Sequence, residues 1–78
     1  MNYRHKSLAN GRWFEFSLIE QLANMGREVG RAIDWRDKDR KISEGAVERA
    51  LELIYLSVED PKNRGRLKEI LRLREALL

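Results

Sequence analysis

The feature that most constrains this chain is a helical pattern of unusual apolar width over residues 13–35. At 100° per residue, its apolar and small side chains cover about half of the helix circumference. They are Phe14, Leu18, Ile19, Leu22, Ala23, Met25, Gly26, Val29, Gly30, Ala32 and Ile33. An arc of this width is too broad for one neighbouring helix, so the pattern predicts contacts on two sides.

The length of the chain limits what can cover that arc. With 78 residues there is room for one domain with a modest core, and such domains are often marginal unless disulfides or oligomerisation help. The absence of cysteine excludes disulfides and thiolate metal sites. We therefore expect part of the arc to bind a second copy of the chain or another protein, with a homodimer as the favoured assembly.

Two further helices are predicted after the first. Six charged residues, 36–41, are interpreted as a solvated linker, and Ser43 is the predicted N-cap of a helix over residues 43–58. Asp60-Pro61 ends that helix, and a third is predicted over residues 61–78, with a start after Gly65 as the alternative. The expected fold is all-α: one domain over residues 13–78 forming a three-helix up-down-up bundle, which self-association can complete.

The middle helix is amphipathic and acidic. Its predicted buried residues are Ala46, Val47, Ala50, Leu51, Leu53, Ile54 and Val58, and its predicted water-facing residues are Glu48, Arg49, Glu52 and Glu59. Residues 42–60 carry a net charge of −4 and residues 61–78 carry +4. Neighbouring antiparallel helices of opposite charge attract, so part of the basic charge is expected to be neutralised inside the bundle.

The first twelve residues differ from the rest of the chain. Arg4, Lys6 and Arg12 give residues 1–12 a charge of +3, and no helical periodicity is present before the turn signal Asn10-Gly11. This segment is predicted to be a flexible basic arm. No apolar stretch approaches the roughly 20 residues that a membrane span requires, so we expect a cytoplasmic protein without membrane association.

A strip of small residues on the first helix is one part of the candidate interface. It consists of Ala23, Gly26 and Gly30. Glycine inside a helix costs about 1 kcal/mol relative to alanine, so two near the middle indicate close approach of another backbone. Three interpretations are open: packing against the small Ala46 and Ala50 of the next helix, a symmetric contact between two copies, or a hinge.

Three aromatic residues complete the candidate interface. Trp13, Phe16 and Trp35 fall outside the apolar arc, near the two ends of the predicted helix. They either cover the ends of the bundle or stand exposed as anchors for a partner, a role in which tryptophan is enriched.

Two charged residues fall on apolar helix faces. Glu15 lies in the arc of the first helix, and Arg74 lies among the leucines of the third. A buried guanidinium and carboxylate in bidentate contact offset part of each other's desolvation cost, so an ion pair between them is one prediction. The simpler alternative is that both side chains reach solvent near helix ends.

A basic stripe on the third helix supports an alternative function. Arg64, Lys68 and Arg72 recur every four residues. Such a stripe can follow phosphate groups and would make the chain an accessory nucleic-acid-binding protein. An ordinary solvated helix face is the simpler interpretation.

The sequence favours no enzymatic activity. The single histidine, His5, lies in the predicted arm, and no second histidine can complete a relay or an imidazole metal site. Glu44, Glu48 and Glu52 share one helix face and could attract a divalent ion, although such rows are usually solvated. Phosphate loops, dinucleotide fingerprints and nucleophile elbows are absent. We expect no catalytic residue, no cofactor and no metal.

Several stretches of the chain resemble a known group of proteins. They are residues 11–16, 21–33, 48–53, 59–70 and 73–75, and they resemble small uncharacterised prokaryotic all-helical proteins without assigned activity. Asn24-Met25 followed by glycines, with the helical pattern, more loosely resembles four-helix proteins encoded in ribosomal-RNA intervening sequences and retroelement accessory proteins. The second resemblance implies an oligomeric, basic protein associated with nucleic acid, but a fourth helix is missing here.

Overall fold

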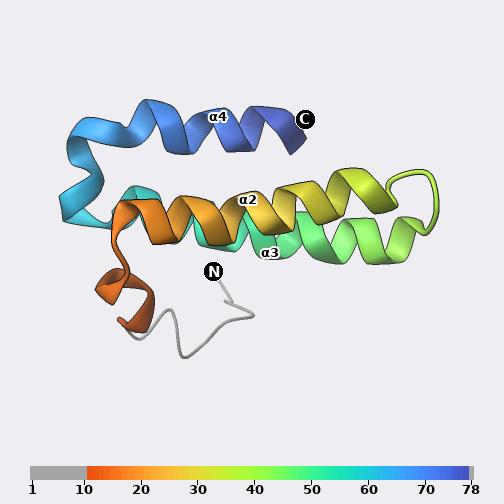
Figure 1. Cartoon of the computed structure of the whole chain (residues 1–78), viewed down its shortest axis with the longest axis horizontal. Coiled ribbons are helices and arrows are strands. Elements are labelled where there is room, and N and C mark those ends of the chain that lie inside the picture. Colours follow the sequence, from red (N-terminus) through yellow and green to blue (C-terminus); the bar gives the residue numbers. More distant parts are fainter. Residues whose placement is uncertain (1–10, 78) are drawn as a thin grey trace.

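Three α-helices in up-down-up order form the body of the molecule. The computed structural model describes residues 11–77. These comprise the 3₁₀ helix η1 (Arg12–Glu15), α2 (Leu18–Trp35), α3 (Arg40–Glu59), the 3₁₀ helix η2 (Pro61–Arg66) and α4 (Leu67–Leu77). Helices α2 and α3 form an antiparallel hairpin, and α4 returns alongside it in the direction of α2 (Figure 1). The predicted all-α three-helix bundle is confirmed.

The first α-helix begins later than predicted. A capping box sets its start: the Ser17 hydroxyl accepts from the Glu20 backbone N–H at 3.2 Å, and the Glu20 carboxylate accepts from the Ser17 N–H at 2.9 Å. Phe16 is extended, so Trp13 lies in η1 and not in α2. The prediction of one continuous helix from Trp13 is therefore wrong.

The second α-helix begins earlier than predicted. The Asp39 carboxylate accepts from the backbone N–H groups of Lys41 at 3.0 Å and Ile42 at 3.3 Å, so Asp39 is the N-cap and Arg40 the first helical residue. The assignment of the N-cap to Ser43 is wrong, because an acceptor one turn earlier already satisfies the first amides.

Ser43 instead joins the two long helices. It is buried, and its hydroxyl donates to the Ala32 carbonyl at 2.7 Å. This bond lies near the loop between α2 and α3, which comprises residues 36–39 and is shorter than the predicted linker. A hydroxyl on the inner face of α3 therefore fixes α3 against the last turns of α2.

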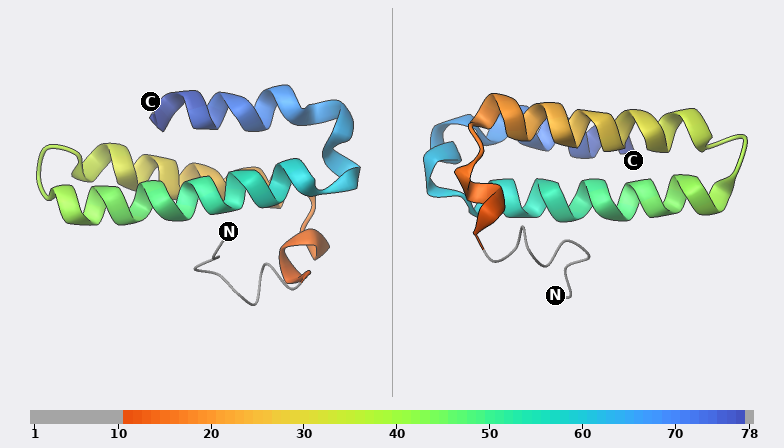
Figure 2. Two further views of the ribbon diagram at one scale, coloured as in Figure 1. Left: turned by 180° about the vertical axis from the view of Figure 1, so that it is seen from behind. Right: turned by 60° about the horizontal axis from the view of Figure 1, so that its bottom comes forward.

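The third helix has two parts. Asp60 caps η2 by accepting from the Lys62 backbone N–H at 3.1 Å, and Pro61 occupies the first position, where its missing N–H is not needed. Regular α-helix begins at Leu67, as in the alternative start after Gly65. Helix α4 ends well before the loop that joins α2 to α3 (Figures 1 and 2).

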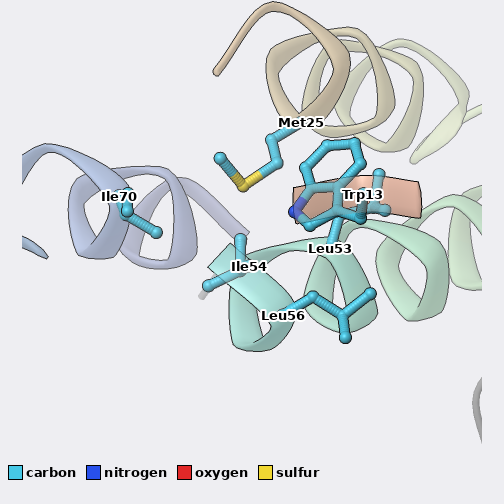
Figure 3. Packing of buried hydrophobic residues seen from close by; sticks show 6 residues of the cluster. All are labelled: Trp13, Met25, Leu53, Ile54, Leu56 and Ile70. Carbon is cyan, nitrogen blue, oxygen red and sulfur yellow. The ribbon is translucent and has the colours of Figure 1, made fainter. Parts of the chain in front are cut away.

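The core draws side chains from four elements. Its buried cluster contains Trp13, Met25, Leu53, Ile54, Leu56 and Ile70, from η1, α2, α3 and α4 (Figure 3). Full burial of one large apolar side chain contributes about 1.5–3 kcal/mol. The 3₁₀ turn η1 is therefore part of the fold, and Arg12, which was predicted to lie in the arm, belongs to it; the predicted arm residues 1–10 lie outside the described residues.

The burial pattern of α3 agrees with most of the prediction and departs from it at Arg49, which is half-buried, and at Glu52 and Leu56, which are buried. Ala46, Ala50, Leu53 and Ile54 are buried, and Val47, Leu51 and Val58 are half-buried. Glu52, predicted to face water, is only 6% exposed, and its Oε2 has no hydrogen-bond partner. It lies on the same flank as the buried Leu56, four residues later. Helix α3 is thus covered over more of its circumference than its apolar residues indicate.

Within residues 11–77, no helix combines the length and the apolar character needed to cross a bilayer.

Candidate functional site

The wide apolar arc of α2 divides into two flanks. One flank faces the core and contains the buried Gln21, Met25, Val29 and Ala32. The other is rotated from it by about a third of a turn. This second flank, called the α2 flank below, consists of Ile19, Ala23, Gly26, Gly30 and Ile33. Residues 11–77 leave this second flank uncovered, and its contact with a partner stays a prediction.

The α2 flank is open to solvent along its length. Ile19 is 79% exposed and Ile33 is 45% exposed, which makes them the two most exposed large hydrophobic residues of the described chain. Ala23 is exposed, and Gly26 and Gly30 are partly exposed. Single exposed apolar residues are ordinary on protein surfaces, whereas a continuous apolar row marks a contact surface.

The glycines of this flank are not explained by packing inside the chain. A Cβ built at Gly26 or at Gly30 would meet no atom within 4 Å. Close approach of α3, with its small Ala46 and Ala50, therefore does not account for them, and that interpretation is wrong. The two glycines therefore have no packing reason within the described chain, which leaves the symmetric contact and the hinge as the interpretations.

The three candidate aromatic residues have different environments. Trp13 is 1% exposed, and its indole N–H donates to the Ser57 hydroxyl at 2.9 Å, so it is no exposed anchor. Phe16 is half-buried and packs edge-on against Trp13, with 5.6 Å between ring centroids. Trp35 is 37% exposed at the end of α2, where the Lys38 ammonium lies 5.9 Å from its ring centroid. Trp35 is the candidate aromatic residue that stays accessible.

A buried polar network, absent from the predictions, fixes the end of the bundle from which α2 starts. The Gln21 amide donates to the Trp13 carbonyl at 3.2 Å and to the Asp60 carboxylate at 3.0 Å. The Asn63 amide donates to Gln21 Oε1 at 2.7 Å and to the Ser57 carbonyl at 2.9 Å. These bonds join η1, α2, the end of α3 and η2, and they satisfy most of the polar groups buried there. A glutamine on the core-facing side of α2 was the sequence signal for this network.

Asp60 is the charged member of this network. Its side chain is buried, and the Lys62 ammonium binds it while also donating to the Phe14 carbonyl at 3.0 Å. Burial alone would raise the pKa of Asp60, but hydrogen bonds from Lys62 and Gln21 outweigh it, so the pKa lies below its ordinary value. Asp60 is therefore held ionised and tied to three elements of the fold.

The predicted pair of Glu15 and Arg74 does not form. Glu15 is exposed in η1, and no hydrogen bond or ion pair joins it to Arg74 in the described part of the chain. Because η1 precedes the start of α2, Glu15 does not lie on the apolar arc. Arg74 is half-buried in α4, and its Nε is buried without a partner.

The candidate basic residues lie on the last two elements. Arg64 belongs to η2, and Lys68 and Arg72 belong to α4; all three are exposed. One ion pair between different helices joins Arg49 on α3 to Glu28 on α2 at 3.2 Å.

Among the described residues, no group of three or more His, Asp or Glu side chains is placed to hold a metal ion. Comparison with protein-family models, curated proteins and solved structures finds no match to this chain.

Proposed function

We propose that this protein is a small, non-enzymatic helical interaction module that pairs with a second copy of itself through the α2 flank. The observation that carries the proposal is the combination of two mid-helix glycines with open space above them and two strongly exposed isoleucines on the same flank. The described chain leaves the two isoleucines exposed and places nothing against the Cβ positions of the two glycines.

Covering the α2 flank with a partner offsets the helix stability lost at its two glycines. Each glycine weakens α2 by about 1 kcal/mol relative to alanine. Covering an exposed isoleucine contributes up to about 1.5–3 kcal/mol. A partner helix that approaches closely over Gly26 and Gly30 brings its own side chains against Ile19 and Ile33. The close approach of the two helices then depends on the absence of side chains at the two glycines.

The spacing of the α2 flank favours a second copy over an unrelated partner. Gly26 lies seven residues after Ile19 and seven residues before Ile33. Seven residues are about two helical turns, so the isoleucines lie about 10 Å from the glycine on either side. If two copies of α2 cross antiparallel at Gly26, each Ile19 meets the Ile33 of the other copy. Such self-complementarity is what a two-fold symmetric interface requires.

The test is sedimentation equilibrium of the full chain over micromolar to millimolar concentrations. We expect a reversible monomer–dimer equilibrium that Gly26→Leu weakens at least tenfold. The leucine side chain starts in open space, and leucine is a better helix former than glycine, so the circular dichroism spectrum of the monomer should change little and its melting temperature should not fall. Gly65→Leu is the matched control, because Gly65 also has open space above its Cβ position but lies on η2.

Two results would overturn the proposal. One is a wild-type chain that stays monomeric at the highest concentration. The other is a dimer that both leucine variants weaken equally, since the contact would then lie elsewhere.

A further inference from the structure

A second surface of the molecule, independent of the α2 flank, carries charge that the fold does not use. Arg64, Lys68 and Arg72 are exposed and make no hydrogen bond or ion pair within the described chain. These three residues are called the basic row below. Surface cations are commonly neutralised by a local acid, so the neighbouring acids decide whether the row keeps its charge.

The nearest acids are mainly engaged by other cations. Both oxygens of Glu69 accept hydrogen bonds from the Arg66 guanidinium, at 2.8 and 2.9 Å, and the interaction of Glu69 with Arg72 is a smaller electrostatic one. Asp60 is buried and holds Lys62. Glu75 is the remaining acid of α4, so the basic row keeps a net positive charge.

The basic row faces away from the bundle. Ile70, which is fully buried, marks the inward direction of α4. Lys68 and Arg72 lie two residues before and two residues after it, so each points about 160° away from the core. Ala76, one turn beyond Arg72, is exposed and small and leaves the face unobstructed. A large ligand can reach the row without any change in the fold.

The row extends over two consecutive elements. Lys68 and Arg72 are separated by about 6 Å along α4, at 1.5 Å per residue. Arg64 lies on η2, which leads into α4 at an angle to its axis (Figure 1), so it adds a third cation before the start of α4. Several exposed cations close together match a polymer with a repeated anion.

We propose that the basic row binds the phosphate backbone of nucleic acid, without sequence preference. The cations supply phosphate contacts, and the row contains no aromatic side chain that could stack on a base. An anionic membrane fits this face less well, because surface-bound helices insert an apolar face and that of α4 is packed into the core. Binding therefore depends on ionic contacts with phosphate groups. These contacts displace counterions from the nucleic acid, so the affinity should fall as the salt concentration rises.

The test is fluorescence anisotropy of labelled 20-nucleotide single strands and 20-base-pair duplexes with the full chain. Three phosphate contacts predict that duplex affinity falls roughly 40-fold between 50 and 200 mM salt, and single-strand affinity roughly 20-fold. The variant Arg64→Gln/Lys68→Gln/Arg72→Gln should lose at least tenfold in affinity at 50 mM salt.

The matched control removes three other exposed cations from the opposite end of the hairpin. It is Arg31→Gln/Arg36→Gln/Lys41→Gln, which changes net charge equally. Retained affinity in this control, with the fold of both variants verified by circular dichroism, supports the proposal. Equal loss in both variants overturns it, as does the absence of oligonucleotide binding at 50 mM salt. Binding to phosphatidylserine vesicles without binding to oligonucleotides overturns it in favour of a lipid surface.

Discussion

Trp13 and Ser57 are 44 residues apart in the chain, and the indole N–H of Trp13 donates to the Ser57 hydroxyl at 2.9 Å inside the bundle. The same hydroxyl donates to the Leu53 carbonyl at 2.8 Å, within α3. This contact fixes η1 on α3 and thereby determines where the chain enters α2. It also satisfies the indole N–H of a tryptophan that is 1% exposed.

Ser57→Ala should therefore destabilise the protein by about 1–3 kcal/mol, because the buried indole N–H loses its acceptor. The free energy of unfolding from urea titration, followed by circular dichroism, measures the effect. Tyr55→Phe is the comparison, since Tyr55 is 37% exposed and its substitution should stay within about 0.5 kcal/mol. Equal stability of wild type and Ser57→Ala would refute the role assigned to this bond.

Gly26→Ala and Gly30→Ala should each stabilise the monomer by up to about 1 kcal/mol. The added methyl groups meet open space, and alanine is the better helix former. Thermal unfolding at low micromolar concentration measures the monomer alone. Gly11→Ala should act in the opposite direction, because Gly11 has a φ of 109°, which alanine tolerates poorly. Destabilisation at Gly26 would show that the open space is filled in solution.

Ser43→Ala should loosen the end of the hairpin without unfolding the molecule. Loss of the bond to the Ala32 carbonyl removes the hydroxyl link between α2 and α3 near their loop, at a cost of about 1 kcal/mol. Hydrogen exchange should accelerate for amides around Ala32 and Ala46, while amides near Trp13 keep their protection. A uniform acceleration across the chain would contradict this local role.

Acid should destabilise the protein through Asp60. Its pKa in the folded chain lies below the ordinary value of 3.8, so ionised Asp60 contributes stability above that value. The contribution is lost as the pH falls below about 4 and through the lower pKa of the folded state. The melting temperature of wild type should therefore exceed that of Asp60→Asn at pH 6, and the difference should shrink towards pH 2. A difference that stays constant over this pH range would contradict the role assigned to the Asp60 carboxylate.

The fold class could be predicted from periodicity, because apolar spacing reports which helix faces are buried. Helix ends were less certain, since they depend on which of several acceptors caps the chain. Ser43 was the predicted N-cap, but Asp39 caps the helix four residues earlier, and Ser43 lies inside the helix with its hydroxyl bonded to the Ala32 carbonyl. At the first helix the pair Ser17 and Glu20 carried the signal of a capping box, but the continuous apolar pattern before it obscured the break.

The candidate interface was predicted in part. The small residues of α2 were recognised from their cost to the helix, whereas their outward direction depends on where α3 and α4 lie. Trp13 was assigned to a helix end because its buried partner, Ser57, is distant in sequence. The polar network around Gln21 was not predicted for the same reason. The hydrogen-bond partners of Gln21 are Asp60 and Asn63, which are distant in sequence and lie beside it only in the folded chain.

The short length of α4 gives the bundle two unequal ends. At one end, η1, η2 and α4 pack against the α2–α3 hairpin, and the polar network joins these elements (Figure 1). At the other end, near the loop of residues 36–39, only α2 and α3 of the described chain meet, through small side chains such as Ala32 and Ala46. The free energy of local unfolding is lower where fewer buried contacts hold the backbone, so the end of the bundle at this loop should unfold locally first. Ile33 and Trp35 lie at this less stable end. A partner that binds these two side chains would therefore stabilise the hairpin against local unfolding.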